Sequence, residues 1–239
     1  MPTPTPGPGT SDSDPGASAP ANAIVFPTIE EMPGWEWCTR RLDGHACASG
    51  RGNATSVKSG HQATPSLDGS SSKFSLGGDT GYSNALWWKS VSGGLDVTHF
   101  IYDVWFYIDN PKVAEALEFD VNQSFNGTRF VWGSECAFKD SHKWDIWDPK
   151  NSQWVPTRLP CPVFSANTWH HISWLLERVN HQVHYISLTV DGKTLPVNIY
   201  KDPEQNFNGT DINVAFQMDG DINQHRYNVW LDKVTLKAW

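Results

Sequence analysis

The chain has 239 residues, a formal net charge of −8 and only 18% charged residues. No cluster of Lys and Arg stands in it, which excludes the electrostatic footprint of a nucleic-acid binder and makes acidic membrane surfaces poor partners. Its apolar runs are far shorter than the roughly 20 residues of a membrane-spanning helix, so we expect a soluble protein. Thirteen tryptophans exceed what a core alone usually recruits, and we expect some of them to face a ligand.

The first segment, residues 1–23, is rich in Pro, Thr, Gly and Ser and has almost no large apolar side chain. Such a segment cannot bury enough surface to fold, so it is predicted to be a disordered linker that tethers the following domain to a neighbour. A disordered terminus without a neighbour is the alternative. The residues after Met1 lack the basic and then apolar pattern of an export signal, so we expect Met1 to begin a truncated form of a longer parent.

Residues 24–239 suit one large β-sandwich better than two ordinary domains. From Ile24 to Gly81, clusters of Gly and Ser interrupt short apolar pieces, which predicts a long, loop-rich entry to the sandwich.

Four cysteines fall into two close pairs, Cys38 with Cys47 and Cys136 with Cys161. Neither pair has the CxxC spacing of a zinc site. Two local disulfides are predicted, which implies an oxidising compartment and therefore a secreted, extracellular protein. Four buried free thiols are the alternative.

Eight later stretches are predicted to be strands, and the first of them alternates apolar with polar or aromatic side chains, the period of two of a half-buried strand. They are Thr98–Asp109, Lys143–Asp148, Gln153–Arg158, Trp169–Arg178, Val183–Val190, Lys193–Ile199, Ile212–Asp219 and Tyr227–Lys237. The second and third of these form a hairpin that carries Trp144, Trp147 and Trp154, whose rings either pack across the strands or form a platform for sugar. No stretch shows sustained helical periodicity, so the prediction is an all-β protein of about a dozen antiparallel strands in two packed sheets.

Another hairpin is predicted from Ala116–Val121 and Arg129–Trp132, with an Asn- and Gly-rich loop over Asn122–Thr128 between them. If Phe119 faces Phe130 across this hairpin, Asp120 faces Arg129 in a simple charge pair.

Three stretches resemble the concanavalin A-like lectin/glucanase superfamily, including laminin G-like jelly rolls: Trp169–Ile172, Ser187–Lys193 and Val229–Leu236. The resemblance covers roughly Trp87 to Trp239 and lies at the level of the fold, because the pattern occurs in binders and enzymes alike. It implies a two-sheet antiparallel jelly roll whose concave sheet holds sugar chains.

Alternation places polar and aromatic side chains on the outward faces of the predicted strands. Flat rings stack on the C–H faces of a pyranose, and carboxylates, amides and Arg make directed hydrogen bonds with its hydroxyls. We therefore predict a carbohydrate-binding module or lectin-like domain that takes a polysaccharide or oligosaccharide in one groove, although a solvated sheet face explains any single polar residue. The expected carbohydrate-binding residues are Trp105, Tyr107, Glu118, Asp120, Arg129, His171, Gln217, Asp219 and Trp230.

Glu118 and Asp120 also support an alternative, a β-glucan hydrolase, because two carboxylates about 7 Å apart on one strand face could serve as nucleophile and helper. The pair looks like the start of the E-x-D-x-E or E-x-D-x-x-E strand of retaining glucanases in the superfamily. The third acid is absent, since Asn122 and Gln123 stand where it would fall and an amide cannot donate the proton. The candidates to replace it are Glu177 and Asp219.

The same Glu-x-Asp pair resembles the metal strand of legume lectins, whose oxygen ligands hold calcium. The downstream Asp and His ligands do not stand at matching positions, so no cofactor is expected with certainty and Ca²⁺ remains an alternative.

Two further function classes remain open. A uronate polysaccharide lyase needs a charge neutraliser and a proton-transfer group, and the residue types are present at Arg129, His171, Tyr185, Gln217 and Tyr227. The R-x-E-L, Q-I-H and Y-F-K-x-G motifs of jelly-roll alginate lyases are absent. An adhesion domain that contacts protein through exposed Trp is the other class.

N-x-[ST] sequons, which predict exposed loops in a eukaryotic secreted host, begin at Asn53, Asn122, Asn126 and Asn208.

Overall fold

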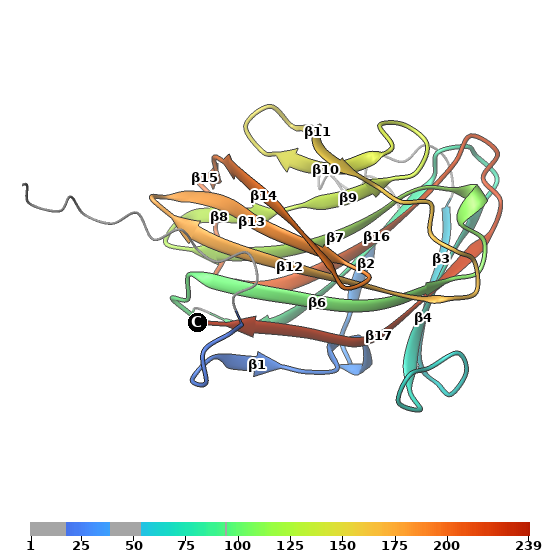
Figure 1. Ribbon diagram of the computed structural model, residues 1–239, viewed down its shortest axis with the longest axis horizontal. Coiled ribbons are helices and arrows are strands. Elements are labelled where there is room, and N and C mark those ends of the chain that lie inside the picture. Colours follow the sequence, from blue (N-terminus) through green and yellow to red (C-terminus); the bar gives the residue numbers. More distant parts are fainter. Residues whose placement is uncertain (1–17, 39–53, 94) are drawn as a thin grey trace, which may run out of the picture.

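A computed structural model describes residues 18–38, 54–93 and 95–239, and two antiparallel sheets make up most of it (Figure 1). Within those ranges the only helical elements are two 3₁₀ turns, η1 (Ile29–Glu31) and η2 (Pro111–Val113). No helix in the described part of the chain is long and apolar enough to span a bilayer. The expected all-β sandwich is confirmed.

The first sheet has eight strands in the order β14-β13-β12-β6-β17-β4-β3, with β1 also paired to β17. It faces the viewer in Figure 1. Its strands are β1 (Ile24–Phe26), β3 (Ala54–Gln62), β4 (Ser71–Gly78), β6 (His99–Ile108), β12 (Trp169–Val179), β13 (Gln182–Val190), β14 (Lys193–Lys201) and β17 (Tyr227–Ala238).

The second sheet has nine strands in the order β11-β10-β9-β7-β16-β5-β2, with β8 paired to β7 and β15 paired to β8. Its strands are β2 (Glu36–Cys38), β5 (Asn84–Ser92), β7 (Ala114–Phe125), β8 (Thr128–Trp132), β9 (Ser134–Ala137), β10 (Lys143–Asp148), β11 (Gln153–Pro160), β15 (Glu204–Gln205) and β16 (Asp211–Gly220).

The core lies between the two sheets and follows from the period of two. On β6, every second side chain from Phe100 to Ile108 is fully buried, and on β7 the same holds from Leu117 to Val121. Phe106 and Phe119 meet across the core with ring centroids 5.5 Å apart. The intervening side chains of each strand must therefore point to the outer face of their own sheet, and this alternation positions every candidate site residue.

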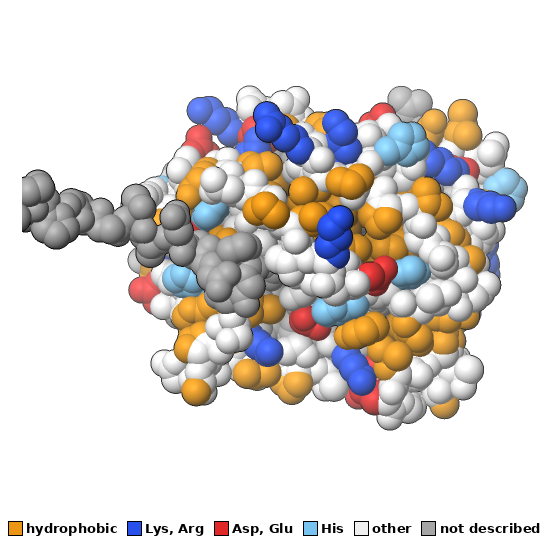
Figure 2. All heavy atoms as spheres, viewed as in Figure 1, with side chains coloured by type: hydrophobic (Ala, Val, Ile, Leu, Met, Phe, Trp, Pro, Cys, Tyr) orange, Lys and Arg blue, Asp and Glu red, His pale blue; other side chains and the backbone are white. Residues whose placement is uncertain are grey.

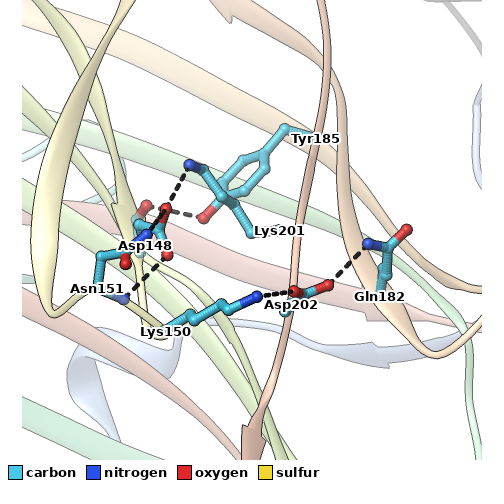
Figure 3. A network of polar contacts seen from close by, with 8 residues as sticks. Asp148, Lys150, Asn151, Gln182, Tyr185, Lys201 and Asp202 are labelled. Carbon is cyan, nitrogen blue, oxygen red and sulfur yellow. Dashed lines mark hydrogen bonds and ion pairs between the residues drawn. The ribbon is translucent and has the colours of Figure 1, made fainter.

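One disulfide and one ion pair join strands on one side of the sandwich. Cys136 on β9 and Cys161, just after β11, form one of the two predicted disulfides. The other predicted pair includes Cys47, which lies outside the described residues. On the same side of the sandwich, Lys201 Nζ on β14 donates to Asp148 Oδ2 on β10 at 2.9 Å, which joins the two sheets (Figure 3). Both side chains are largely buried.

The predicted loop over Asn122–Thr128 is wrong, because β7 continues to Phe125 and turns at Asn126 and Gly127 into β8. Both turn residues have positive φ, 48° and 77°, which is typical of a two-residue hairpin turn. The polar residues fit inside the strand because their side chains find partners. Gln123 Nε2, for example, donates to the carbonyl oxygens of Leu95 and Val97.

This longer strand also changes the register of the hairpin. Phe130 lies opposite Gln123, and Arg129 lies opposite Ser124, so the expected pairing of Arg129 with Asp120 is wrong. The guanidinium of Arg129 instead pairs with Glu204 on β15 at 3.6 Å.

The predicted irregular entry from Ile24 to Gly81 is wrong as well. It contains β1, β2, β3 and β4, and β4 pairs with β17 near the middle of the first sheet. Its Ser and Gly content hides the strand pattern, although Phe74 and Leu76 enter the core on alternate positions.

Candidate functional site

Polar side chains gather on the outer face of the second sheet, where three neighbouring strands present acids in register. Glu118 on β7 lies directly opposite Gln217 on β16 and Glu135 on β9. Asp120 and Asp219 follow two residues along their own strands and so share this face. We call Glu118, Asp120, Glu135 and Asp219 the carboxylate cluster.

The cluster is compact and internally hydrogen-bonded. Oxygens of Glu118, Glu135 and Asp219 all lie within 4.8 Å of one another. Gln217 Nε2 donates to both oxygens of Asp219, at 3.1 and 3.3 Å, and the side chain of Asn84 on β5 bonds the same carboxylate.

Asp120 forms the inner end of the cluster. Its Oδ1 accepts from the backbone N–H of Ser134 at 3.1 Å, and its carboxyl group is hydrogen-bonded to that of Glu118. One of two hydrogen-bonded carboxyl groups must carry the proton between them, so Glu118 and Asp120 act as a pair that shares a proton.

Burial and mutual repulsion displace the pKa of every acid in the cluster. The pKa of Glu135 rises from 4.5 to about 9, first because of desolvation and then because of nearby Asp219, Asp145 and Asp120. The pKa of Asp219 rises from 3.8 to about 7 for the same first reason, although hydrogen bonds from Asn84 and Gln217 oppose the rise.

The pKa of Asp120 rises only to about 6, because hydrogen bonds from Glu118 and Ser134 and the charge of Arg129 offset part of its burial. The pKa of Glu118 lies well above 4.5, through desolvation and the charge of Asp120. Perturbed acids held together in this way are a signature of functional sites.

A pocket of about 420 Å³ opens above the cluster. Glu135 and Asp219 line it, whereas Glu118 and Asp120 are next to them in the sheet but are not among its lining residues. Tyr82 and Trp154 supply aromatic walls, and the indole of Trp154 packs against that of Trp147 at 5.3 Å. Acids, amides and aromatic rings therefore meet in one hollow, as a sugar site requires.

Gly133 lets the aromatic wall approach the cluster. A Cβ at this position would lie 2.8 Å from the Cβ of Trp147 and 3.6 Å from Oδ1 of Asp120. Only a glycine allows both side chains to stay where they are.

The carboxylates of Glu118, Glu135 and Asp219 are also the groups that could hold a metal ion, and hard oxygen donors suit calcium. The expected calcium strand, Glu118 with Asp120, is not the set that converges, because Asp120 turns to Ser134 and Glu118 instead.

A larger hollow of about 730 Å³ lies at the edge of the sandwich, between the loops that include Lys150, His181 and Asp202. Its acids already have partners: Asp202 pairs with Lys150 and accepts a hydrogen bond from Gln182, as Figure 3 shows, and Glu204 pairs with Arg129. It therefore offers fewer free groups to a ligand than the pocket over the cluster.

The nine expected carbohydrate-binding residues do not converge in a single groove. Glu118, Asp120, Gln217 and Asp219 lie together on the second sheet, and Arg129 lies on the same sheet but pairs with Glu204 and Phe207. The remaining four, Trp105, Tyr107, His171 and Trp230, lie on the outer face of the first sheet. The expectation of one trough is wrong, because alternation fixes the outward side of each strand but not the sheet to which it belongs.

On the first sheet these side chains contact one another. Trp230 and Trp169 flank Tyr107 across the strands, and the ring of Trp105 stacks on His171 at 4.6 Å. Figure 2 shows this side of the molecule, where hydrophobic side chains are scattered among polar ones.

Glu177, one of the two acids expected to replace the missing third carboxylate, also lies on the first sheet, bonded to His184 and His99. Tyr185 and Tyr227 are buried and donate to the carbonyl oxygens of Gly133 and Asp219, so neither hydroxyl is free for proton transfer.

Asp219, the other acid expected to replace the missing carboxylate, does lie beside Glu118, and the structure adds an acid that the sequence did not indicate, Glu135. Its signal is weak because β9 has only four residues, Ser-Glu-Cys-Ala. The disulfide partner Cys136 could have placed it, since a half-cystine that faces the core sends its neighbour Glu135 to the outer face.

Comparisons with known proteins show the fold and no closer relationship. No protein-family model matches the chain, and no curated protein matches its sequence. Among solved structures, the endo-β-1,4-glucuronan lyase of the fungus Trichoderma reesei is similar at a TM-score of 0.52 and 13% identity, over 88% of this chain and 94% of that one. The cellulose induced protein Cip1 is similar at a TM-score of 0.52 and 11% identity, over 84% of this chain and 90% of that one.

Proposed function

We propose that this chain, a jelly-roll β-sandwich of the concanavalin A-like type, is a glycoside hydrolase that binds a polysaccharide across the outer face of the second sheet and cleaves it at the carboxylate cluster. The observation that carries the proposal is the pair Glu135 and Asp219, which face one pocket with pKa values of about 9 and about 7.

The two acids suit the two roles of glycoside hydrolysis. Glu135 holds its proton at neutral pH and can donate it to the leaving glycosidic oxygen. Asp219 loses its proton more readily and, supported by Gln217 and Asn84, can act as the nucleophile. The oxygens lie within 4.8 Å of one another, closer to the separation of retaining enzymes, about 5–5.5 Å, than to the wider gap of inverting ones.

Glu118 and Asp120 position this pair. Glu118 lies opposite Glu135 in the sheet and is hydrogen-bonded to Asp120. The charge of Asp120 in turn helps to raise the pKa of Glu135, and the charge of Glu135 helps to raise the pKa of Glu118, as in other carboxylate groups that share a site.

The names of the structural neighbours agree with a polysaccharide substrate, since one is a glucuronan lyase and another is induced by cellulose. Lyase chemistry on uronates has less support in this chain. It needs a group that neutralises the uronate carboxylate, and no Lys or Arg is among the residues that line the pocket.

Release of reducing ends from a panel of neutral and amino polysaccharides tests the proposal. The unmodified protein should release them with retention of anomeric configuration, and Glu135→Gln should lower the rate by about 10²–10⁴-fold. Glu36→Gln, an exposed glutamate on β2 of the same sheet, is the matched control and should keep full activity. Absence of cleavage across the panel, or full activity in Glu135→Gln, would contradict the proposal.

A second candidate is a carbohydrate-binding domain without catalysis. It is favoured by Asn122, an amide where retaining glucanases of similar strand pattern carry the third acid on the same strand. This candidate predicts calorimetric binding of a glycan, no release of reducing ends, and weaker binding in Trp154→Ala.

The disulfide between Cys136 and Cys161 supports an oxidising compartment, and we propose that the protein is secreted. We also propose that residues 1–23 link residues 24–239 to a neighbouring domain, on the composition of that segment.

A further inference from the structure

One of the two aromatic residues that line the pocket, Tyr82, has a ring that no other ring of the fold holds. Its side chain is 50% exposed, and no stacking contact or side-chain hydrogen bond joins it to another described residue. Tyr200, the other exposed tyrosine in the described part of the chain, stacks on His184 with ring centroids 3.9 Å apart. Ring contacts within the fold therefore do not explain why a tyrosine stands at position 82.

The backbone of Tyr82 is in a conformation that bulky residues rarely adopt. Its φ is 60°, in the left-handed region that glycine adopts freely. It is the only Phe, Tyr or Trp with a positive φ among the described residues. Strain of this kind weakens a fold and is found most often at active sites and ligand clamps, so we expect the side chain to serve the pocket.

A neighbouring turn holds the strained residue in place. The N–H of Tyr82 donates to the carbonyl oxygen of Asp221 at 2.9 Å. The two turns approach so closely that a Cβ on Gly81 would lie 2.2 Å from the carbonyl oxygen of Ile222. Tyr82 is therefore tied to the end of β16, the strand whose next-to-last residue is Asp219.

The second aromatic residue of the pocket lies on the other side of the acids. Trp154 is on β11, at one edge of the second sheet, whereas Tyr82 comes two residues before β5. The strands β10, β9, β7 and β16 lie between β11 and β5. Glu135 on β9 and Asp219 on β16 therefore lie between the two aromatic residues.

We propose that Tyr82 is a substrate-binding residue whose ring stacks on a sugar unit on the Asp219 side of the cleavage site, an inference that rests on the proposed function of the same pocket. A flat ring with a polar end suits this role, because its face packs on the C–H groups of a pyranose while its hydroxyl stays in water. Trp154 takes a sugar unit on the Glu135 side. A substrate must therefore extend past the acids in both directions to contact both rings.

Calorimetry with neutral oligosaccharides of increasing length tests the inference, and series of β-linked glucose, xylose and mannose oligomers serve as probes. Glu135→Gln is the parent protein, so that bound oligomers stay intact. Its affinity should rise with length until an oligomer contacts both rings. Adding Tyr82→Ala should weaken binding of the long oligomers by about tenfold and that of the shortest ones much less, whereas Tyr82→Phe, which keeps the ring, should retain most of the affinity.

Two further variants separate binding from folding. Tyr82→Gly should bind long oligomers as weakly as Tyr82→Ala, yet melt at the same temperature as the parent protein or a higher one, because glycine adopts a φ of 60° without strain. Tyr200→Ala, at an exposed tyrosine on β14 of the first sheet, should change no affinity. Full affinity in Tyr82→Gly would overturn the inference. So would a lower melting temperature in that variant, because the side chain would then serve the fold.

The outcomes distinguish the inference from the proposed function. If the unmodified protein releases reducing ends while the Tyr82 variants bind as tightly as the parent, the inference fails and the hydrolase stands. If the Tyr82 variants lose affinity but the unmodified protein releases no reducing ends, Tyr82 is a binding residue and the hydrolase fails. If no oligomer is bound or cleaved, both fail.

Discussion

Replacing Glu135 with Gln should make the protein more stable at neutral pH while it lowers the proposed activity. Glu135 is 9% exposed, and its pKa rises from 4.5 in a free chain to about 9 in the fold. Between these values the folded protein binds a proton that the unfolded chain has lost. The free energy of unfolding therefore falls as the pH rises through this window.

The size of the effect follows from the displacement of the pKa. At pH 7, 2.5 pH units above 4.5, this residue costs the fold about 3 kcal/mol at about 1.4 kcal/mol per pH unit. Gln keeps the shape of the side chain and cannot ionise, so Glu135→Gln should gain up to about 3 kcal/mol, or about 6–12 °C in melting temperature for a domain of this size.

Urea denaturation at a series of pH values from 4 to 8 measures this difference. The stabilities of the two proteins should nearly coincide near pH 4 and separate steadily above pH 5 as the unmodified protein weakens. Glu36→Gln, at an exposed position, should follow the unmodified protein throughout. Equal stability of Glu135→Gln and the unmodified protein at pH 7, with the same slope, would refute the reasoning.

Three further predictions concern the framework of the site. Lys201→Met leaves the carboxylate of Asp148 without its main partner and should lower the free energy of unfolding, measured in urea, by about 1–3 kcal/mol. Because Lys201 holds the pKa of Asp148 below 3.8, this loss of stability should be complete at neutral pH. It should become smaller only as the pH falls below 3.8. Gly81→Ala places a Cβ 2.2 Å from the carbonyl oxygen of Ile222 and should cost about 1–3 kcal/mol in a thermal melt, whereas Gly93→Ala, whose Cβ would lie 3.4 Å from its nearest neighbour, should cost much less. In a host that attaches N-glycans, peptide mass spectrometry should find sugar at the exposed Asn126 and Asn208 but not at Asn122, which is buried; sugar on Asn122 would contradict the placement of β7.

The sequence predicts most strands well wherever large apolar residues alternate with others. β6, β12, β16 and β17 begin and end within a residue or two of the expected bounds. It fails where the alternation uses small or polar residues, as in β4 with its serines and in the second half of β7. Gln123 occupies a core position there, because its amide finds two carbonyl oxygens that only the folded chain brings within reach.

The candidate site is predicted only in part. Glu118, Asp120, Gln217 and Asp219 meet because β7 and β16 are neighbours in one sheet. Trp105 also points outward from its strand, but that strand belongs to the first sheet. No pattern within a single strand shows to which of the two sheets the strand belongs. Glu135 was missed for a related reason, since four residues of strand carry too few alternations to be recognised.

Acids on the two outer faces differ in whether they have cationic partners, and this difference is the best guide to function. Three acids on or beside the outer face of the first sheet have a histidine partner: Asp103 pairs with His171, Asp191 with His170, and Glu177 with His184. On the second sheet, Glu118, Glu135 and Asp219 form no ion pair with a described cation, although they are more deeply buried.

An acid paired with a cation near the surface changes the stability of the fold by at most about 1 kcal/mol. Acids that repel one another and raise their own pKa values weaken the fold, and such an arrangement persists where the strain serves a site. We therefore expect replacement of the paired acids on the first face to cost little stability. Replacement of the acids in the carboxylate cluster should instead lower activity and raise the free energy of unfolding. Opposite changes in activity and stability would therefore distinguish a catalytic face from a structural one.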